Sequence, residues 1–160
     1  MSKDKGNPML VPDIKDKKGE HKIVVGIPVA LEKADVVFNM DHLAFSGDFP
    51  VGIKYMHLLA NRLKEMGIKG NIIGIFHGDA AYMTLNDNAY NMYRHVSTGN
   101  PVKVLIAELM KQDVQLEVCS VSLKNNQWGN EDLLPGVQVN NGAVGRLIQL
   151  VQDGYVQIQP

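Results

Sequence analysis

The stretch Asn71-Ile72-Ile73-Gly74-Ile75-Phe76 decides the fold class of this chain. A short apolar run of this length, rich in β-branched residues, is typical of a buried strand. Two further runs of the same character, Lys22 to Ile27 and Val114 to Val121, predict strands on either side of it in the sequence. Tyr155 to Gln159 alternates apolar and polar residues, which predicts a last strand at an edge of the sheet.

Three stripes of apolar residues at helical spacing lie between and after these runs. The first ends at Gly67, which can adopt the left-handed conformation that follows many helices. The second comes after Asn100-Pro101, a capping residue followed by a proline suited to the first helical position. The third closes at Gly154. The stripes are formed by Tyr55, Leu58, Leu59, Leu63 and Met66, by Val102, Leu105, Ile106 and Leu109, and by Val144, Leu147, Ile148 and Val151.

Strands that alternate with helices pair in parallel, because a parallel connection usually contains a helix. The right-handed crossover rule then places helices on both faces of the sheet. We therefore predict an α/β fold, a three-layer α/β/α sandwich with a mostly parallel sheet of about five strands. The segment from Ala30 to Pro50 is predicted to be a long loop that forms a lid or a subunit contact. Its large apolar side chains would form an exposed patch on a monomer, and they are Val36, Val37, Phe38, Phe45 and Phe49.

Composition limits the classes of protein to which the chain can belong. The 160 residues fit one domain, with residues 1–20 as a flexible N-terminal arm and residues 21–160 as the folded part. Charge is balanced, with 16 Lys and Arg against 17 Asp and Glu, and no basic stripe is interleaved with aromatic residues, so nucleic acid is not an expected partner. No apolar run could span a bilayer. We expect a cytoplasmic protein, or a periplasmic one if a leader has been removed.

The most informative functional residue is Cys119, the only cysteine, at the end of a predicted strand. Ligands of open parallel sheets gather beyond the carboxyl ends of the strands, so this thiol is expected to face a pocket. His77 follows the strand that ends at Phe76 and is expected at the same edge. A nearby imidazolium, or the amino end of a helix beginning near Asp79, would lower the pKa of the thiol from about 8.5 towards neutrality.

Simpler roles exist for both residues. A free cysteine often packs as a small buried hydrophobe, and a histidine at a strand end often bonds only to backbone. A metal site of His42, His77, Asp79 and Cys119 is conceivable by ligand type, but the spacing forms no motif, so no metal is predicted. Dinucleotide and phosphate-loop fingerprints are absent from the sequence, so no cofactor is predicted either.

Several short motifs in order give the chain a resemblance that composition does not supply. They are Phe76-His77-Gly78-Asp79-Ala80-Ala81, Leu85-Asn86-Asp87-Asn88-Ala89-Tyr90, Asn100-Pro101, Leu105-Ile106, Leu109, Val118-Cys119, Asp132-Leu133 and Asp153-Gly154-Tyr155. On these motifs the sequence from His21 to Pro160 resembles the DsrE/DsrF-like sulfur-relay family, and is closest to its stand-alone DsrE-like branch. The resemblance makes residues 21–160 a single DsrE-like domain.

The resemblance implies a flavodoxin-like fold, assembly into homotrimers or hexamers, and a cysteine that carries sulfane sulfur as a persulfide. Cys119 matches that cysteine and His77 matches the histidine of the family motif, so these two are the predicted catalytic residues. The chain departs from the usual Cys-Gly-Gln-Ser, which here reads Cys119-Ser120-Val121-Ser122. The glycine and the amide of the family motif are therefore missing.

Three hypotheses for function follow. The first is a persulfide carrier or sulfurtransferase of sulfur metabolism, in which Cys119 accepts sulfur from a donor protein and passes it to an acceptor protein. The lack of a second cysteine fits this role, because a carrier needs no resolving thiol of its own. The second is a non-catalytic small-molecule or metal-binding oligomeric module, and the third is a structural oligomer in which Cys119 only packs.

Two structural expectations accompany these hypotheses. The protein is expected to be a homo-oligomer, a trimer or a multiple of one, with Ala30 to Pro50 at or near the interface. Trp128, in the polar loop Lys124 to Asp132, is expected to close over the mouth of the Cys119 pocket. Replacing His77 with alanine is expected to raise the pKa of the thiol.

Overall fold

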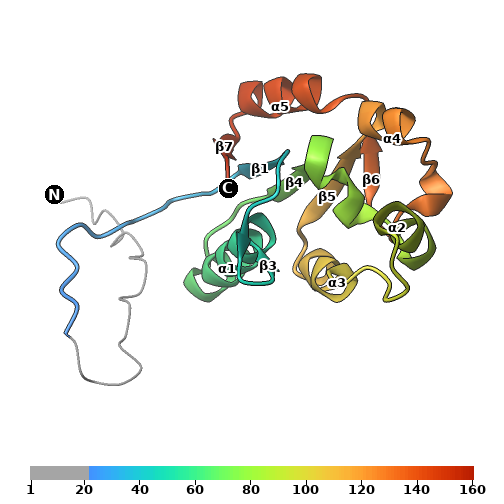
Figure 1. The fold of residues 1–160 in the computed structure, drawn as a ribbon. Helices are drawn as coiled ribbons and strands as arrows, with labels where there is room; N and C mark the ends of the chain where they lie inside the picture. Colours follow the sequence, from blue (N-terminus) through green and yellow to red (C-terminus); the bar gives the residue numbers. More distant parts are fainter. Residues whose placement is uncertain (1–21) are drawn as a thin grey trace, which may run out of the picture.

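The computed structural model describes residues 22–160, and the predicted arm of residues 1–20 lies outside them. Its centre is a five-stranded parallel sheet in the order β6-β5-β4-β1-β7 (Figure 1). The strands are β1 Val36–Met40, β4 Ile72–Phe76, β5 Gln115–Cys119, β6 Gln138–Asn140 and β7 Val156–Ile158. The predicted parallel sheet of about five strands is confirmed, and β7 is the predicted edge strand.

Helices and short turns connect these strands. The helices are α1 Val51–Met66, α2 Asp87–Arg94, α3 Lys103–Lys111, α4 Ser120–Asn126 and α5 Ala143–Gln152, with 3-10 turns η1 Gly78–Thr84 and η2 Asn130–Asp132. A small antiparallel hairpin, β2 Phe45–Ser46 and β3 Phe49–Pro50, precedes α1. The three predicted stripes correspond to α1, α3 and α5. Gly67 ends α1 with a φ of 63°, as predicted.

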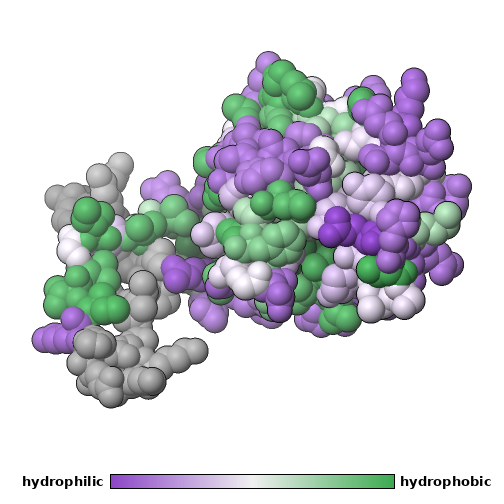
Figure 2. Space-filling view, viewed as in Figure 1, coloured by the Kyte–Doolittle hydropathy of each residue, from purple (hydrophilic) through white to green (hydrophobic). Residues whose placement is uncertain are grey.

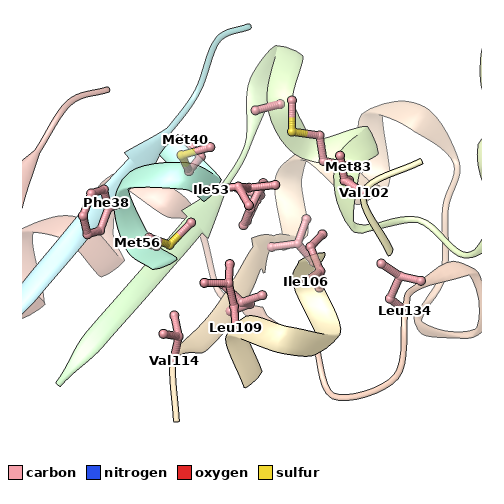
Figure 3. Packing of buried hydrophobic residues seen from close by; sticks show 14 of the residues in the cluster. Phe38, Met40, Ile53, Met56, Met83, Val102, Ile106, Leu109, Val114 and Leu134 are labelled. Atoms are coloured by element: carbon pink, nitrogen blue, oxygen red, sulfur yellow. The ribbon is translucent and has the colours of Figure 1, made fainter. Parts of the chain in front are cut away.

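Helices cover both faces of the sheet, which makes the fold the predicted three-layer α/β/α sandwich. α1 and α3 lie on one face and α5 lies on the other (Figure 1). The larger core cluster fills the α1 and α3 side, where side chains such as Phe38, Met56 and Ile106 interdigitate (Figure 3). A smaller cluster lies under α5, and its buried residues are Val37, Ile73, Ile75, Cys119, Ala143, Leu147 and Leu150.

The first strand is not where the sequence pattern placed it. Lys22 to Ile27 forms no strand, and its residues are exposed. The strand is Val36–Met40, inside the segment predicted to be a loop, and all five of its residues are buried. The physical reason is that β1 pairs with β4 on one side and β7 on the other, so its short apolar run is buried on both faces.

Because β1 lies within this segment, part of the predicted apolar patch is buried in the core. Val36, Val37 and Phe38 belong to the core, whereas Phe45 and Phe49 of the hairpin are 47% and 46% exposed. Of the five side chains in the predicted patch, only the two in the hairpin are therefore exposed. Among residues 22–160, no helix has the length and apolar character required to cross a membrane.

Candidate active site

The carboxyl ends of the five parallel strands bring a row of polar residues to one edge of the sheet. In spatial order this row contains Asn140 of β6, Cys119 of β5, His77 after β4, Asp41 after β1 and Gln159 after β7. The structure therefore places the two predicted catalytic residues, Cys119 and His77, at the same edge and on neighbouring strands. This is the location that parallel sheets use for ligands.

His77 and Cys119 also point to the same face. Phe76 is in register with Val118, and the backbone stays extended through His77, with φ −158° and ψ 175°. One step further along the register therefore sets His77 beside Cys119. Because side chains alternate along a strand, both residues lie on the face covered by α5, as do Ile75 and Glu117.

Donors from two helices favour a thiolate at Cys119. Cys119 is the residue immediately before α4, so its sulfur lies at the amino end of that helix, where the amides of Ser122 and Val121 lower the pKa of the thiol. The amide of Ala143, at the start of α5, donates to Sγ over 3.3 Å. The hydroxyl of Ser122, which also lowers the pKa of the thiol, accepts from the amide of Gly78 over 3.1 Å. Ser122 thus links the residue after His77 to the first turn of α4.

These donors decide the acidity of the thiol. Burial raises the pKa of Cys119, because the side chain is only 5% exposed and a buried charge is poorly solvated. The amides of Ser122, Ala143 and Val121 and the hydroxyl of Ser122 outweigh that effect and hold the pKa below its ordinary value. The predicted helix near Asp79 is not among the groups that lower this pKa, and the amides at the starts of α4 and α5 have that effect instead.

The predicted imidazolium does not supply this effect. His77 is not among the groups that lower the pKa of Cys119. Burial lowers the pKa of His77 itself, and the opposing attraction of Asp41 is weaker, so the ring is neutral at neutral pH. The expected ion pair between His77 and the thiolate is thus wrong, because a partly buried imidazole at this edge resists protonation.

A chain of hydrogen bonds fixes the tautomer of His77. Asp41 can only accept, so Gln159 donates to it through Nε2 over 2.8 Å. The other amide atom of Gln159, Oε1, accepts from Asn39 Nδ2 over 2.7 Å. Asn39 Oδ1 therefore faces His77 Nε2, 2.6 Å away, and Nε2 must donate. Nδ1 of His77 is consequently the unprotonated ring nitrogen.

A buried ion pair lies on the same face of the sheet as Cys119, and the sequence analysis did not predict it. Glu117, two residues before Cys119 on the same face of β5, has a side chain that is 3% exposed. Arg146 of α5 donates to it from Nε and from NH2, both over 2.9 Å. Gln115 and Asn140 donate to the same carboxylate. A charged residue within an apolar strand was the signal that could have revealed this pair.

One other sequence prediction is corrected. Trp128 stacks edge-on against Tyr93, with ring centroids 5.1 Å apart, and packs on the larger cluster, while Cys119 belongs to the smaller cluster on the opposite face. The prediction that Trp128 covers the sulfur is therefore wrong. Within the described residues 22–160, no group of three His, Cys, Asp or Glu side chains could hold a metal ion, and Asp79 is exposed.

The comparison with protein families identifies the relatives of this chain. The model of the DsrE/DsrF-like family matches residues 53–160, which is most of the folded part. The chain belongs to the DsrE/DsrF-like family. Membership supports a role related to sulfur metabolism, and members of the family oligomerise. No curated protein matches the sequence.

Two solved structures share the DsrE-like fold at low sequence identity. A protein of unknown function from Methanobacterium thermoautotrophicum, MTH1491, has 20% identity and a TM-score of 0.62, over 80% of this chain and 100% of its own. The ychN protein from E. coli has 13% identity and a TM-score of 0.57, over 79% of this chain and 99% of its own. At this identity the likeness shows the fold alone.

The geometry also clarifies how the chain departs from the family motif Cys-Gly-Gln-Ser. Ser122 occupies the position of the serine in that motif, and its amide and hydroxyl both lower the pKa of Cys119. Ser120 and Val121 replace the glycine and the glutamine, but the amide of Val121 still lowers the pKa of Cys119. The donors around the sulfur in this DsrE-like chain are therefore provided by backbone and by Ser122.

Proposed function

We propose that this protein is a sulfur carrier of the sulfurtransferase type, in which Cys119 holds sulfane sulfur as a persulfide. The observation that carries the proposal is one buried sulfur that lies at the amino end of α4 and accepts from the amide of Ala143 over 3.3 Å. A cysteine that only packs needs no such donors, whereas a nucleophilic thiolate requires them because burial alone disfavours its charge. The pKa of the thiol is lowered despite its burial.

The transfer step balances without an added oxidant or reductant. The Cys119 thiolate attacks the outer sulfur of a donor protein's persulfide. A bond forms between Sγ and that sulfur, the S–S bond of the donor breaks, and the donor leaves as a thiolate. The second transfer repeats the step, because an acceptor thiolate attacks the outer sulfur and Cys119 leaves as a thiolate. The donors from Ser122 and Ala143 stabilise Cys119 in both its attacking and its leaving form.

His77 is proposed to act on the protons of the transferred sulfur. Its Nε2 is committed to Asn39, so Nδ1 is the atom available to accept a proton from the persulfide. A neutral ring suits this role, because an imidazolium has no free lone pair. His77 thus acts as a base for the persulfide.

The assembly is proposed to be a homotrimer or a hexamer, in which the hairpin from Phe45 to Pro50 contributes to contacts between subunits. Phe45 and Phe49 support this, since both aromatic side chains remain about half exposed on the single subunit. Donor and acceptor proteins would approach the carboxyl edge of the sheet, where Cys119 lies.

Alkylation of the native protein tests whether Cys119 can act at all. Iodoacetamide should modify Cys119 in the folded protein, and the rate should rise with pH around a midpoint below that of a free thiol. Cys119→Ser is the control, because it removes the only thiol of the chain. If modification occurs only after denaturation, the sulfur is a core atom and the carrier proposal fails.

A further inference from the structure

Residues 22–34 leave the domain as an extended segment before β1 (Figure 1). Apolar side chains gather on it, shown in green in Figure 2. We call residues 22–34 the arm from here on, and they are distinct from residues 1–20. Six large apolar residues of the arm are between 36% and 84% exposed. They are Ile23, Val24, Val25, Ile27, Val29 and Leu31. An apolar run of this size exposed to water indicates a surface that is covered in the working protein.

The arm has the sequence pattern of an edge strand. Ile23, Val25, Ile27, Val29 and Leu31 recur at every second position, so an extended backbone would present all five on one face. Pro28 lies on the alternate positions and has no backbone N–H. A proline is tolerated in an outermost strand, where its nitrogen faces outwards. The pattern therefore predicts a strand with one apolar face and only one paired edge.

A matching surface exists at the opposite side of β1. Among residues 22–160, β7 pairs only with β1, so its outer backbone edge is open. Beside that edge lies an almost wholly apolar groove of about 370 Å³ along α5. Its lining residues are Val144, Leu147, Ile148, Val151, Gln152 and Gln157. Val144, Ile148 and Val151 are 69%, 54% and 49% exposed, so this face of α5 has no cover within the described subunit.

We propose that residues 23–31 of a second copy of this chain add as an outer strand to β7 and lay their apolar face in the α5 groove. The nine residues span roughly 30 Å when extended, so about half of their length is enough to cover the ten residues of α5, which span about 15 Å. Each copy has one arm and one groove, so two copies can exchange arms reciprocally about a two-fold axis.

The path of the arm favours a second copy over its own subunit. The amide of Ala34 donates to the carbonyl of Lys69 over 3.0 Å, and Lys33 forms a parallel bridge with the same residue. Lys69 precedes β4, so the arm is tied to the β4 side of β1. The open edge of β7 lies on the other side of β1. The arm is thereby directed away from the groove of its own chain.

Disulfide cross-linking between two differently tagged, co-expressed full-length chains tests the proposal. Both chains carry Cys119→Ser, so the test is independent of the sulfur chemistry at that residue. One chain carries Val25→Cys and the other Val151→Cys, which places one thiol on the arm and one in the groove. Val104→Cys on α3 replaces Val151→Cys in the control, because Val104 is at least as accessible, with 62% exposure against 49% for Val151.

The expected result is a disulfide between the two tagged chains for positions 25 and 151, formed at least about tenfold faster than for positions 25 and 104. Equal rates for the two pairs would overturn the proposal. So would a chain carrying both Val25→Cys and Val151→Cys that cross-links only within itself, because the arm would then cover its own groove. As a second measurement, Ile23→Ser with Ile27→Ser should raise the dissociation constant of the oligomer about tenfold or more. An unchanged constant would contradict the proposal.

Discussion

The amide nitrogen of Ala143 lies 3.3 Å from the sulfur of Cys119, and this contact joins the first residue of α5 to the last residue of β5. The acidity of the thiol therefore depends on where α5 lies on the sheet. α5 is held in that place by the ion pair between Arg146 and Glu117, one turn further along the helix. The packing of the second layer and the chemistry of the site are thus coupled.

The first prediction concerns Ser122. Ser122→Ala removes one hydroxyl donor from the thiolate, and a hydrogen bond to a charged acceptor contributes about 1.5 kcal/mol, so the thiolate fraction near neutral pH should fall about tenfold. The pH profile of alkylation measures this. Ser120→Ala is the matched control, because Ser120 gives no bond to the sulfur. Equal profiles for the two variants would show that the hydroxyl does not stabilise the thiolate.

His77 provides the second prediction. His77→Ala should leave the midpoint of the alkylation profile of Cys119 almost unchanged, because the neutral imidazole does not contribute to the lowered pKa of the thiol. Transfer of sulfur to an acceptor should slow if His77 is the base for the persulfide. If His77→Ala instead raised the midpoint pH of Cys119 alkylation as much as Ser122→Ala, His77 would have to be an imidazolium that stabilises the thiolate.

The third prediction concerns the buried ion pair. Arg146→Ala leaves the carboxylate of Glu117 buried without its charged partner, which should lower the free energy of unfolding by about 3 kcal/mol. Lys103→Ala breaks an exposed pair with Asp87 and should cost less than about 1 kcal/mol. Denaturant unfolding compares the two variants. Similar losses would mean that the Glu117 carboxylate does not depend on Arg146.

The fourth prediction is a pH dependence of stability. The pKa of Cys119 is lowered in the folded protein below the ordinary value of a free thiol, so between these two values the unfolded state binds more protons. The free energy of unfolding should therefore rise with pH through this window in the wild type relative to Cys119→Ser. The contribution is complete above the ordinary value and is lost as the pH falls through the lowered one. Parallel curves for the two proteins would contradict a stabilised thiolate.

The fifth prediction concerns two glycines whose replacement by alanine should change the stability of the fold in opposite directions. A Cβ at Gly70 would lie within 1.9 Å of the backbone oxygen of Ala34, so Gly70→Ala must push β1 away from β4 and destabilise the fold by several kcal/mol, on the order of 3. Gly145 is exposed within α5, with open space around it, and Gly145→Ala should stabilise by about 0.5–1 kcal/mol. Thermal unfolding measures both changes in stability. A Gly70→Ala protein as stable as the wild type would contradict the close approach between Gly70 and Ala34.

The sequence predicted the fold well where a run of residues has one dominant pattern. β4, β5 and β7 and the helices α1, α3 and α5 all follow from such runs. The first strand was placed wrongly because Lys22 to Ile27 has the stronger β-branched pattern, whereas β1 owes its burial to two neighbouring strands that lie far away in the sequence. A local pattern of residues indicates that a segment can form a strand, but pairing with strands that are distant in the sequence decides which segment does.

The sequence predicted where Cys119 and His77 lie in the fold but did not predict their electrostatics. The positions of Cys119 and His77 follow from the strand ends of a parallel sheet, which is a topological rule. The source of the lowered thiol pKa depends on the amide of Ala143, a residue 24 positions further along the chain, and on the protonation of His77. Neither the approach of α5 nor the burial of an imidazole can be calculated from residue types alone.

The most direct test of the proposed sulfur carrier is mass spectrometry of the intact native protein after incubation with a low-molecular-weight persulfide donor. The account predicts a gain of about 32 Da, the mass of one sulfur atom, which maps to the Cys119 peptide and is removed by a thiol acceptor. Cys119→Ser, incubated in parallel, should show no gain. A wild-type protein that remains unmodified while its denatured form takes up sulfur would contradict the account.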